Sequence, residues 1–157
     1  MLPDHFSRDI AVRCRSLLHR LMPEVGNLQT TFLLAMATPM IVLPIERLFK
    51  PSEGYTTVTG DDRELDEMLA SRVADTLAPE KTFGEAPFAV SARWSYVPGH
   101  RPFNTAEEWP YELLSKLKSQ EAFDEAMAAP AYRIMLDLRN ALAHGGVTYL
   151  DKNGQNT

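Results

Sequence analysis

Residues 130–146 read PAYRIMLDLRNALAHGG and predict the last helix of the fold. Pro130 suits the first turn of a helix, because the amide hydrogen that proline lacks would have no partner there. Apolar side chains then recur at steps of three and four residues, at Ile134, Met135, Leu138 and Leu142. Gly145 can adopt the left-handed conformation that ends many helices. The stretch therefore predicts an amphipathic helix that ends beside His144.

Most of the remaining chain also has helical periodicity. An apolar side that includes Cys14 recurs over residues 6–21, opposite a basic side formed by Arg8, Arg13, Arg15 and Arg20. A second helix is expected from about Asn27, and Pro39 should kink or stop it because proline removes a backbone donor. Pro44 then suits the start of a shorter helix through Leu48.

The middle of the chain predicts a loop, a helix and a longer loop. Asp61 with Glu64 resembles an N-cap pair that opens a helix through Leu77. Residues 78–104 are rich in proline and read as a long ordered loop, with Trp94 and Tyr96 as aromatic anchors. Residues 111–127 predict a helix in two pieces, and residues 147–154 a short strand and turn. The fold class is all-α, one domain over residues 1–157, a bundle of about five helices.

Composition and charge restrict the functional class. A single cysteine excludes an internal disulfide and a thiolate metal cluster, which fits a reducing cytoplasm. The most apolar run, Phe32–Ile45, is shorter than the roughly 20 residues of a membrane span, so we expect a core segment and no membrane contact. The net charge of −5 argues against a uniformly basic nucleic-acid-binding surface. Residues 51–80 hold most of the acidic excess, whereas residues 1–50 are slightly basic.

Arg139, Asn140 and His144 form the candidate catalytic site at the end of the last predicted helix. Arginine offers a planar fork of donors that matches phosphate oxygens. Histidine exchanges a proton near neutral pH, and Asn140 adds a neutral donor and acceptor. These groups suit cleavage of RNA by its own 2′-hydroxyl without a metal or cofactor. The spacing alone is a weak signal. Arg13–His19 and Arg93–His100 are also separated by between four and six residues.

One histidine per chain predicts a homodimer. Attack by the 2′-hydroxyl needs both a base and an acid, and each chain offers one histidine at this position. A symmetric dimer that brings two last helices together would supply the second.

Residues 138–146 (LRNALAHGG) resemble the signature of the HEPN superfamily, in which an arginine is followed by a polar residue and, after four to six intervening positions, a histidine. The resemblance covers residues 136–151. It implies a helical bundle, frequent dimers and metal-independent ribonuclease activity in toxin–antitoxin or anti-phage systems. Arg139 and His144 would be catalytic, Asn140 would support them, RNA would be the substrate, and an antitoxin or another defence protein would be a further partner. Gly146 stands where HEPN toxins that are modified by a nucleotidyltransferase carry a tyrosine.

Two other hypotheses stay open at this point. The chain could be an inactive HEPN module that binds RNA, a nucleotide or a partner protein. It could also be a scaffold or antitoxin-like protein in which Arg139 pairs with an acid such as Asp137 or Asp151, and the cation merely stabilises a helix end.

Overall fold

The structure, a computed structural model, describes residues 5–89, 94–98 and 110–147. Within these ranges the chain forms helices joined by loops and contains no β-strand, which confirms the predicted all-α fold class. The predicted strand and turn lie outside the described residues apart from Val147, which is not in a strand.

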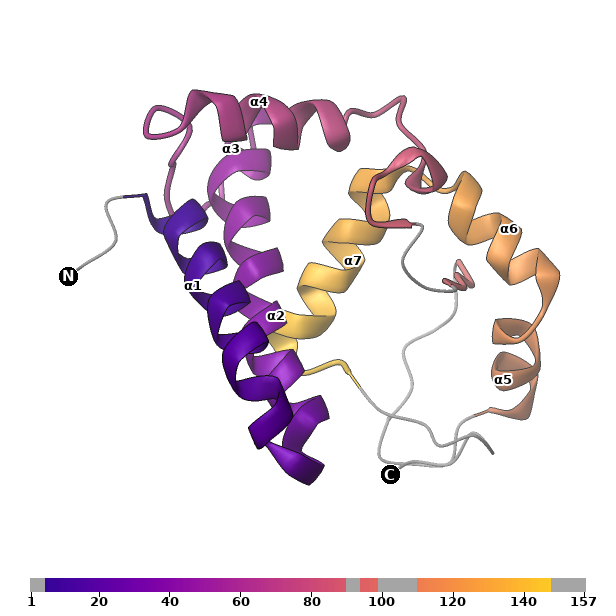
Figure 1. Ribbon diagram of the computed structural model, residues 1–157. Helices are drawn as coiled ribbons and strands as arrows, with labels where there is room; N and C mark the ends of the chain where they lie inside the picture. The colour runs from indigo at the N-terminus through magenta and orange to yellow at the C-terminus, as the bar shows by residue number, and fades with distance from the viewer. Residues whose placement is uncertain (1–4, 90–93, 99–109, 148–157) are drawn as a thin grey trace.

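The first two long helices form an antiparallel hairpin (Figure 1). Helix α1 (Phe6–Leu21) packs along α2 (Gln29–Pro44), and two short 3-10 turns, Met22–Glu24 and Gly26–Leu28, connect them. Cys14 is buried between them as expected.

The predicted new helix at Pro44 is wrong, and α2 does not stop at Pro39, because the helix continues through both prolines. Helix α2 passes directly into a π-helical turn, η3 (Ile45–Phe49), and then into α3 (Lys50–Ser52). The backbone N–H of Lys50 donates to the carbonyl of Ile45, five residues back, so the wide turn keeps the chain hydrogen-bonded. The Thr38 hydroxyl donates to the carbonyl of Leu34 at 2.8 Å, just before the first proline.

The expected core segment is only partly buried. No residue of α2 is buried, although Ile45 at its end is. A helix that is apolar on all sides cannot cover its whole surface against α1 and α7, and Leu28 and Leu33 remain exposed. By length and composition alone, Gly26–Ser52 could cross a membrane. Within the structure this segment contacts α1, α4 and α7.

Helix α4 (Glu67–Thr76) begins later than the Asp61–Glu64 pair predicts. Asp66 is its N-cap, and its carboxylate accepts a hydrogen bond from the amide of Leu69 at 3.0 Å. Asp61 instead accepts hydrogen bonds from the Arg63 side chain, which lower the pKa of Asp61 to about 2. The helix starts later because Asp61, the predicted cap, is bound to Arg63 and the next residue, Asp62, is engaged elsewhere.

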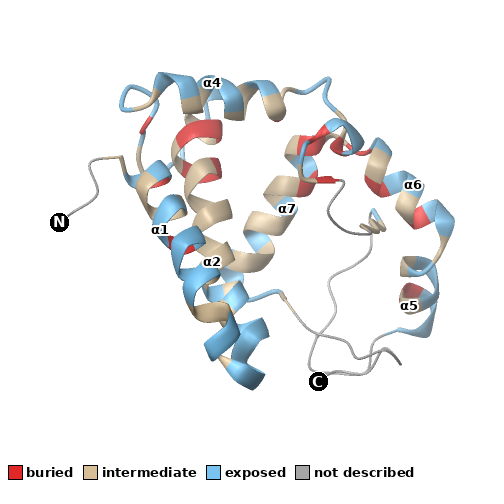
Figure 2. Ribbon diagram, in the orientation of Figure 1, coloured by how far each residue is buried: buried red, intermediate tan, exposed pale blue. Residues whose placement is uncertain are grey.

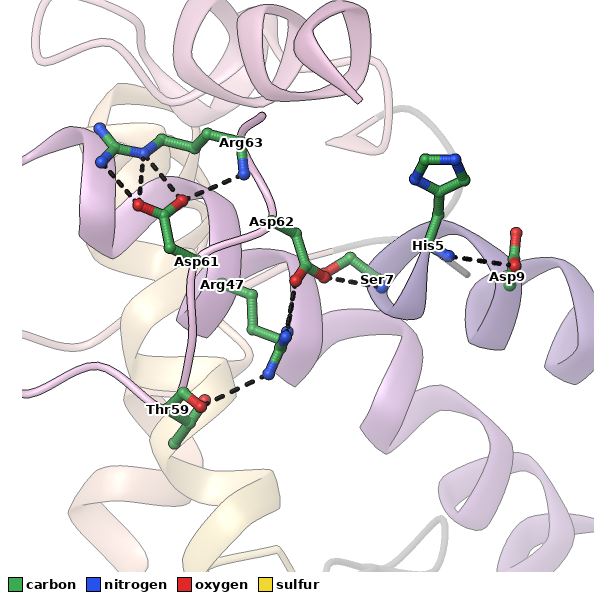
Figure 3. Close-up of polar contacts among 8 residues, drawn as sticks. All are labelled: His5, Ser7, Asp9, Arg47, Thr59, Asp61, Asp62 and Arg63. Atoms are coloured by element: carbon green, nitrogen blue, oxygen red, sulfur yellow. Dashed lines mark hydrogen bonds and ion pairs between the residues drawn. The ribbon is translucent and has the colours of Figure 1, made fainter. Parts of the chain in front are cut away.

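Asp62 joins three segments of the fold through one buried carboxylate (Figure 3). It accepts hydrogen bonds from the amide and hydroxyl of Ser7 at 3.1 and 2.7 Å, in the first turn of α1. Its other oxygen accepts from Nε and Nη2 of Arg47 at 2.9 and 2.6 Å. The Arg47 contact is the main cause of a lowered Asp62 pKa. Asp62 therefore caps α1 and ties it to the π-helical turn.

The second half of the described chain packs around α7 (Ala131–His144). Helices α5 (Tyr111–Leu117) and α6 (Gln120–Ala128) confirm the helix predicted in two pieces. A 3-10 turn, η4 (Phe83–Glu85), packs against α6 and α7, and Phe83 is fully buried. The predicted aromatic anchors lie nearby. The Trp94 ring packs edge-on against Phe83, with ring centroids 5.2 Å apart, and the backbone N–H of Tyr96 donates to the carbonyl of Ala122.

Buried residues concentrate at η3, at η4 and at the start of α7 (Figure 2). One cluster includes Ile45, Phe49, Leu77 and Ala131, and a second surrounds Phe83 and Ile134. The far ends of the α1–α2 hairpin and of α7 lie outside these clusters, so the candidate residues on the last turns of α7 sit at the edge of the core.

Asp62→Asn is expected to lower the free energy of unfolding by about 1–3 kcal/mol at pH 7, because the half-buried guanidinium of Arg47 loses its charged partner. The native Asp62 pKa lies below its ordinary value, so its contribution is complete above about pH 4. It is lost as pH falls through the native pKa. Urea unfolding from pH 7 to pH 2 should show this acid-dependent component in the wild type and its loss in Asp62→Asn; superimposable wild-type and variant profiles would contradict the assignment.

Gly60→Ala is expected to lower stability by about 1–3 kcal/mol. A Cβ atom at Gly60 would lie 2.6 Å from Cζ of Arg47, whose guanidinium Asp62 holds in place. Thermal unfolding should show the loss in Gly60→Ala, whereas Gly146→Ala, whose new atom meets only ordinary contacts, should change little. The loss of stability caused by Gly60→Ala should be smaller in an Asp62→Asn background, because Arg47 can then move away from the new Cβ atom.

Candidate functional site

Helix α7 carries all three predicted site residues and is fixed at its N-terminal end. Pro130 is its N-cap residue, as predicted, and Ala131 is completely buried. The Ala131 amide donates to the carbonyl of Lys81 at 2.9 Å. The other end stops at Gly145, whose φ of +69° is the left-handed conformation that the sequence predicts. His144 is therefore the last helical residue.

Arg139 lies at a buried carboxylate that belongs to the π-helical turn. Nε of Arg139 is 2.6 Å from Oε1 of Glu46, and the Glu46 side chain is only 3% exposed. Nζ of Lys50 lies 2.7 Å from the same oxygen. The angles fall short of hydrogen-bond geometry, so both contacts are ion pairs without a hydrogen bond. Arg139 is 16% exposed, which leaves part of its guanidinium accessible.

The charges of this cluster do not cancel. Two cations, Lys50 and Arg139, meet one carboxylate, so the group carries a formal charge of +1. A low-polarity environment strengthens attraction between that excess charge and an anion at the surface. The arrangement can hold Arg139 in one direction and still leave positive charge for a phosphate.

Asn140 and His144 occupy exposed positions beside this cluster. Oδ1 of Asn140 accepts a hydrogen bond of 2.7 Å from Nη1 of Arg139. This contact links the side chains of two consecutive residues of α7. The His144 side chain is exposed and makes no hydrogen bond or ion pair with any residue in the described ranges. The structure thus joins Arg139 to Asn140, and it leaves the imidazole open to solvent at the helix end.

Sequence reasoning missed Glu46 and Lys50. Glu46 is the only acid between residues 25 and 52, and Lys50 follows it by one helical turn. A single acid in such an apolar stretch predicts a buried ion pair, because a buried carboxylate needs a cation. Arg139 does pair with an acid, as the scaffold alternative expects, but that acid is Glu46, whereas Asp137 accepts a hydrogen bond from the Tyr96 hydroxyl at 3.3 Å. Asp151 lies outside the described residues.

Other candidate residues have ordinary surroundings. The four arginines of α1 are exposed, and Arg8 pairs with Asp9 and Asp66. His19 is exposed on the same helix, whereas Arg93, His100 and Trp109 lie outside the described residues. Across the part of the chain that is described, no group of three or more His, Cys, Asp or Glu side chains is arranged to hold a metal ion.

Comparisons with protein-family models, with curated protein sequences and with solved structures find no match to this chain.

Glu46→Gln is expected to lower the free energy of unfolding by about 2–4 kcal/mol, because Lys50 and Arg139 would face each other with no anion between them. Chemical denaturation followed by circular dichroism measures the change. Glu53→Gln, which alters an exposed acid on the same segment, is the matched control and should change stability by less than about 0.5 kcal/mol. Equal stabilities of the two variants would show that the cluster does not hold α7 in place.

Proposed function

We propose that this protein is a metal-independent endoribonuclease of the HEPN type, with Arg139 and His144 as its catalytic residues and Asn140 in support. One observation carries the proposal: Arg139 is anchored by Glu46 on the same helix end that leaves His144 exposed. The resemblance of residues 136–151 to the HEPN signature supplies the chemistry. The charge of +1 at the Arg139 cluster supplies attraction for a phosphate.

The reaction needs one base, one acid and one cation. A neutral His144 removes the proton of the RNA 2′-hydroxyl, and the oxygen attacks the adjacent phosphorus. The bond from phosphorus to the 5′-oxygen breaks, and that oxygen takes a proton from a second, protonated histidine. Arg139 stabilises the negative charge that builds on the phosphoryl oxygens. The products carry a 2′,3′-cyclic phosphate and a 5′-hydroxyl.

The second histidine is proposed to come from a second copy of the chain. Exposed apolar side chains on the α1–α2 hairpin support self-association, among them Val12, which is 61% exposed, and Leu28, which is 60% exposed. Helices α2 and α7 pack together, so a dimer through the hairpin would bring two α7 ends near one interface. A cytoplasmic defence role with an antitoxin or other protein partner follows from the resemblance alone.

A second function is favoured by the burial of Arg139. Only 16% of that side chain is exposed, and Glu46 neutralises much of its charge. A cation in this state suits a structural or ligand-binding role as well as catalysis. The alternative is therefore an inactive HEPN module that binds RNA, a nucleotide or a partner protein.

His144→Ala is expected to lower RNA cleavage by 100-fold or more, the usual contribution of a general acid or base being about 10²–10⁴-fold. The full chain is incubated with structured and single-stranded RNA in EDTA, and the product ends are identified by mass. Arg139→Ala and Arg139→Lys should also lose activity, because lysine lacks the planar fork. His19→Ala and Arg63→Ala, which alter exposed residues away from α7, should keep it.

Thermal unfolding of each variant separates chemistry from folding. His144 is exposed at a helix end, so His144→Ala should fold as the wild type does. Cleavage that survives both His144→Ala and Arg139→Lys would refute the active site. RNA binding by the wild type with no cleavage of any RNA would establish the binding module instead.

A further inference from the structure

An apolar cavity of about 460 Å³ lies between α2, α4 and α7. Its walls come from three helical segments, α2 with η3, α4 and α7, and include Ile41, Ile45, Val73, Leu77, Met135 and Leu138. Phe88 and Trp94 add aromatic surface on a further side. The volume falls within the range of about 300–1,000 Å³ that is usual for small-molecule sites. The cavity is therefore large enough for one small apolar ligand.

A single cation lines this otherwise apolar cavity. Arg72 on α4 contributes to the lining, and its guanidinium makes no hydrogen bond or ion pair with a residue of the described ranges. The hydroxyl of Thr76, also in the lining, donates to the backbone carbonyl of Arg72 at 2.7 Å. No carboxylate belongs to the lining. An arginine of this kind favours a ligand that carries its own anionic group.

The surroundings of Arg72 exclude a ligand that is only an anion. Residues 51–80 hold eight acids and two bases, so the field around α4 repels small anions. Burial of hydrocarbon in the cavity must supply the rest of the binding free energy. A ligand that combines an apolar body with one carboxylate meets both conditions.

We propose that this cavity binds an amphipathic monocarboxylate with the chemistry of a medium-chain fatty acid. The hydrocarbon chain lies against Ile45, Val73 and Leu138, and the carboxylate pairs with Arg72 at the edge. The proposal does not rest on ribonuclease activity, because none of these residues is assigned to the reaction. Ile45 and Leu138, which line the cavity, are the sequence neighbours of Glu46 and Arg139.

The probe is decanoate, and 1-decanol is its neutral counterpart. Trp94 lines the cavity, and Trp109 is the other tryptophan of the chain, so a Trp109→Phe background makes Trp94 the only indole reporter. Fluorescence titrations below the aggregation limit of each probe give the two dissociation constants. Decanoate should bind about tenfold or more tightly than decanol, the usual worth of a charge-assisted contact. Ligand-observed NMR with the unmodified chain checks that the background substitution is harmless.

Two variants test the two parts of the proposal. Arg72→Gln should weaken decanoate about tenfold and leave decanol unchanged, because it removes only the charge. Val73→Phe should weaken both probes, because it fills the cavity. Arg20→Gln, which removes an exposed arginine on α1, is the matched control and should change neither. Thermal unfolding verifies that Val73→Phe folds. If Val73→Phe does not fold, the affinities of Arg72→Gln for the two probes test the proposal.

Three results would overturn the proposal. If decanoate binds no more tightly than decanol, or binds Arg72→Gln as tightly as the wild type, Arg72 does not bind the carboxylate. If decanoate does not bind at concentrations up to about 1 mM, the cavity is not a binding site for this class of ligand. Self-association of the wild type that Val73→Phe abolishes and decanoate does not compete would show that a second copy of the chain covers the cavity.

Discussion

The ion pair between Glu46 and Arg139 is the polar contact on which the arrangement of the helices depends. Glu46 belongs to the π-helical turn at the end of α2, and Arg139 belongs to α7, so the contact joins the N-terminal hairpin to the C-terminal helix. A buried carboxylate tolerates few positions, because it must stay within reach of its cations. Lys50 on the same segment secures it from the other direction. This cluster therefore joins α7 to the π-helical turn at a second place, five residues before His144.

The two buried acids, Asp62 and Glu46, differ in how well their charges are matched by neighbouring groups. Asp62 meets one arginine and both hydrogen-bond donors of Ser7, so its charge is fully matched and it acts as a structural clamp for α1. Glu46 meets two cations without hydrogen-bond geometry, so it leaves an excess of positive charge. A satisfied cluster contributes mainly to stability, whereas an unsatisfied one can still respond to a ligand. This difference directs attention to Glu46 and Arg139 for function.

The sequence predicts what local patterns determine and misses what distant residues decide. Helix α7, its proline start and its glycine end are predicted correctly, because each signal lies within or beside the helix itself. The start of α4 is predicted wrongly, because Asp61, the predicted cap, is bound to Arg63 and the next residue is held by Ser7 and Arg47, so that Asp66 caps the helix. Of the candidate site, Arg139, Asn140 and His144 are found by spacing. Glu46 and Lys50 are missed, since their contact with Arg139 arises only when two distant helices pack.

The long apolar segment Gly26–Ser52 has a consequence for how this protein is made. It leaves the ribosome soon after α1, with which it can pair at once, but long before α7, which covers its other end. In that interval the nascent chain displays a hydrophobic helix long enough to attract the machinery that recognises membrane-bound segments. Glu46, Arg47 and Lys50 place three charges near its end. The residues that later contact α7 therefore also mark where the apolar part of this segment ends.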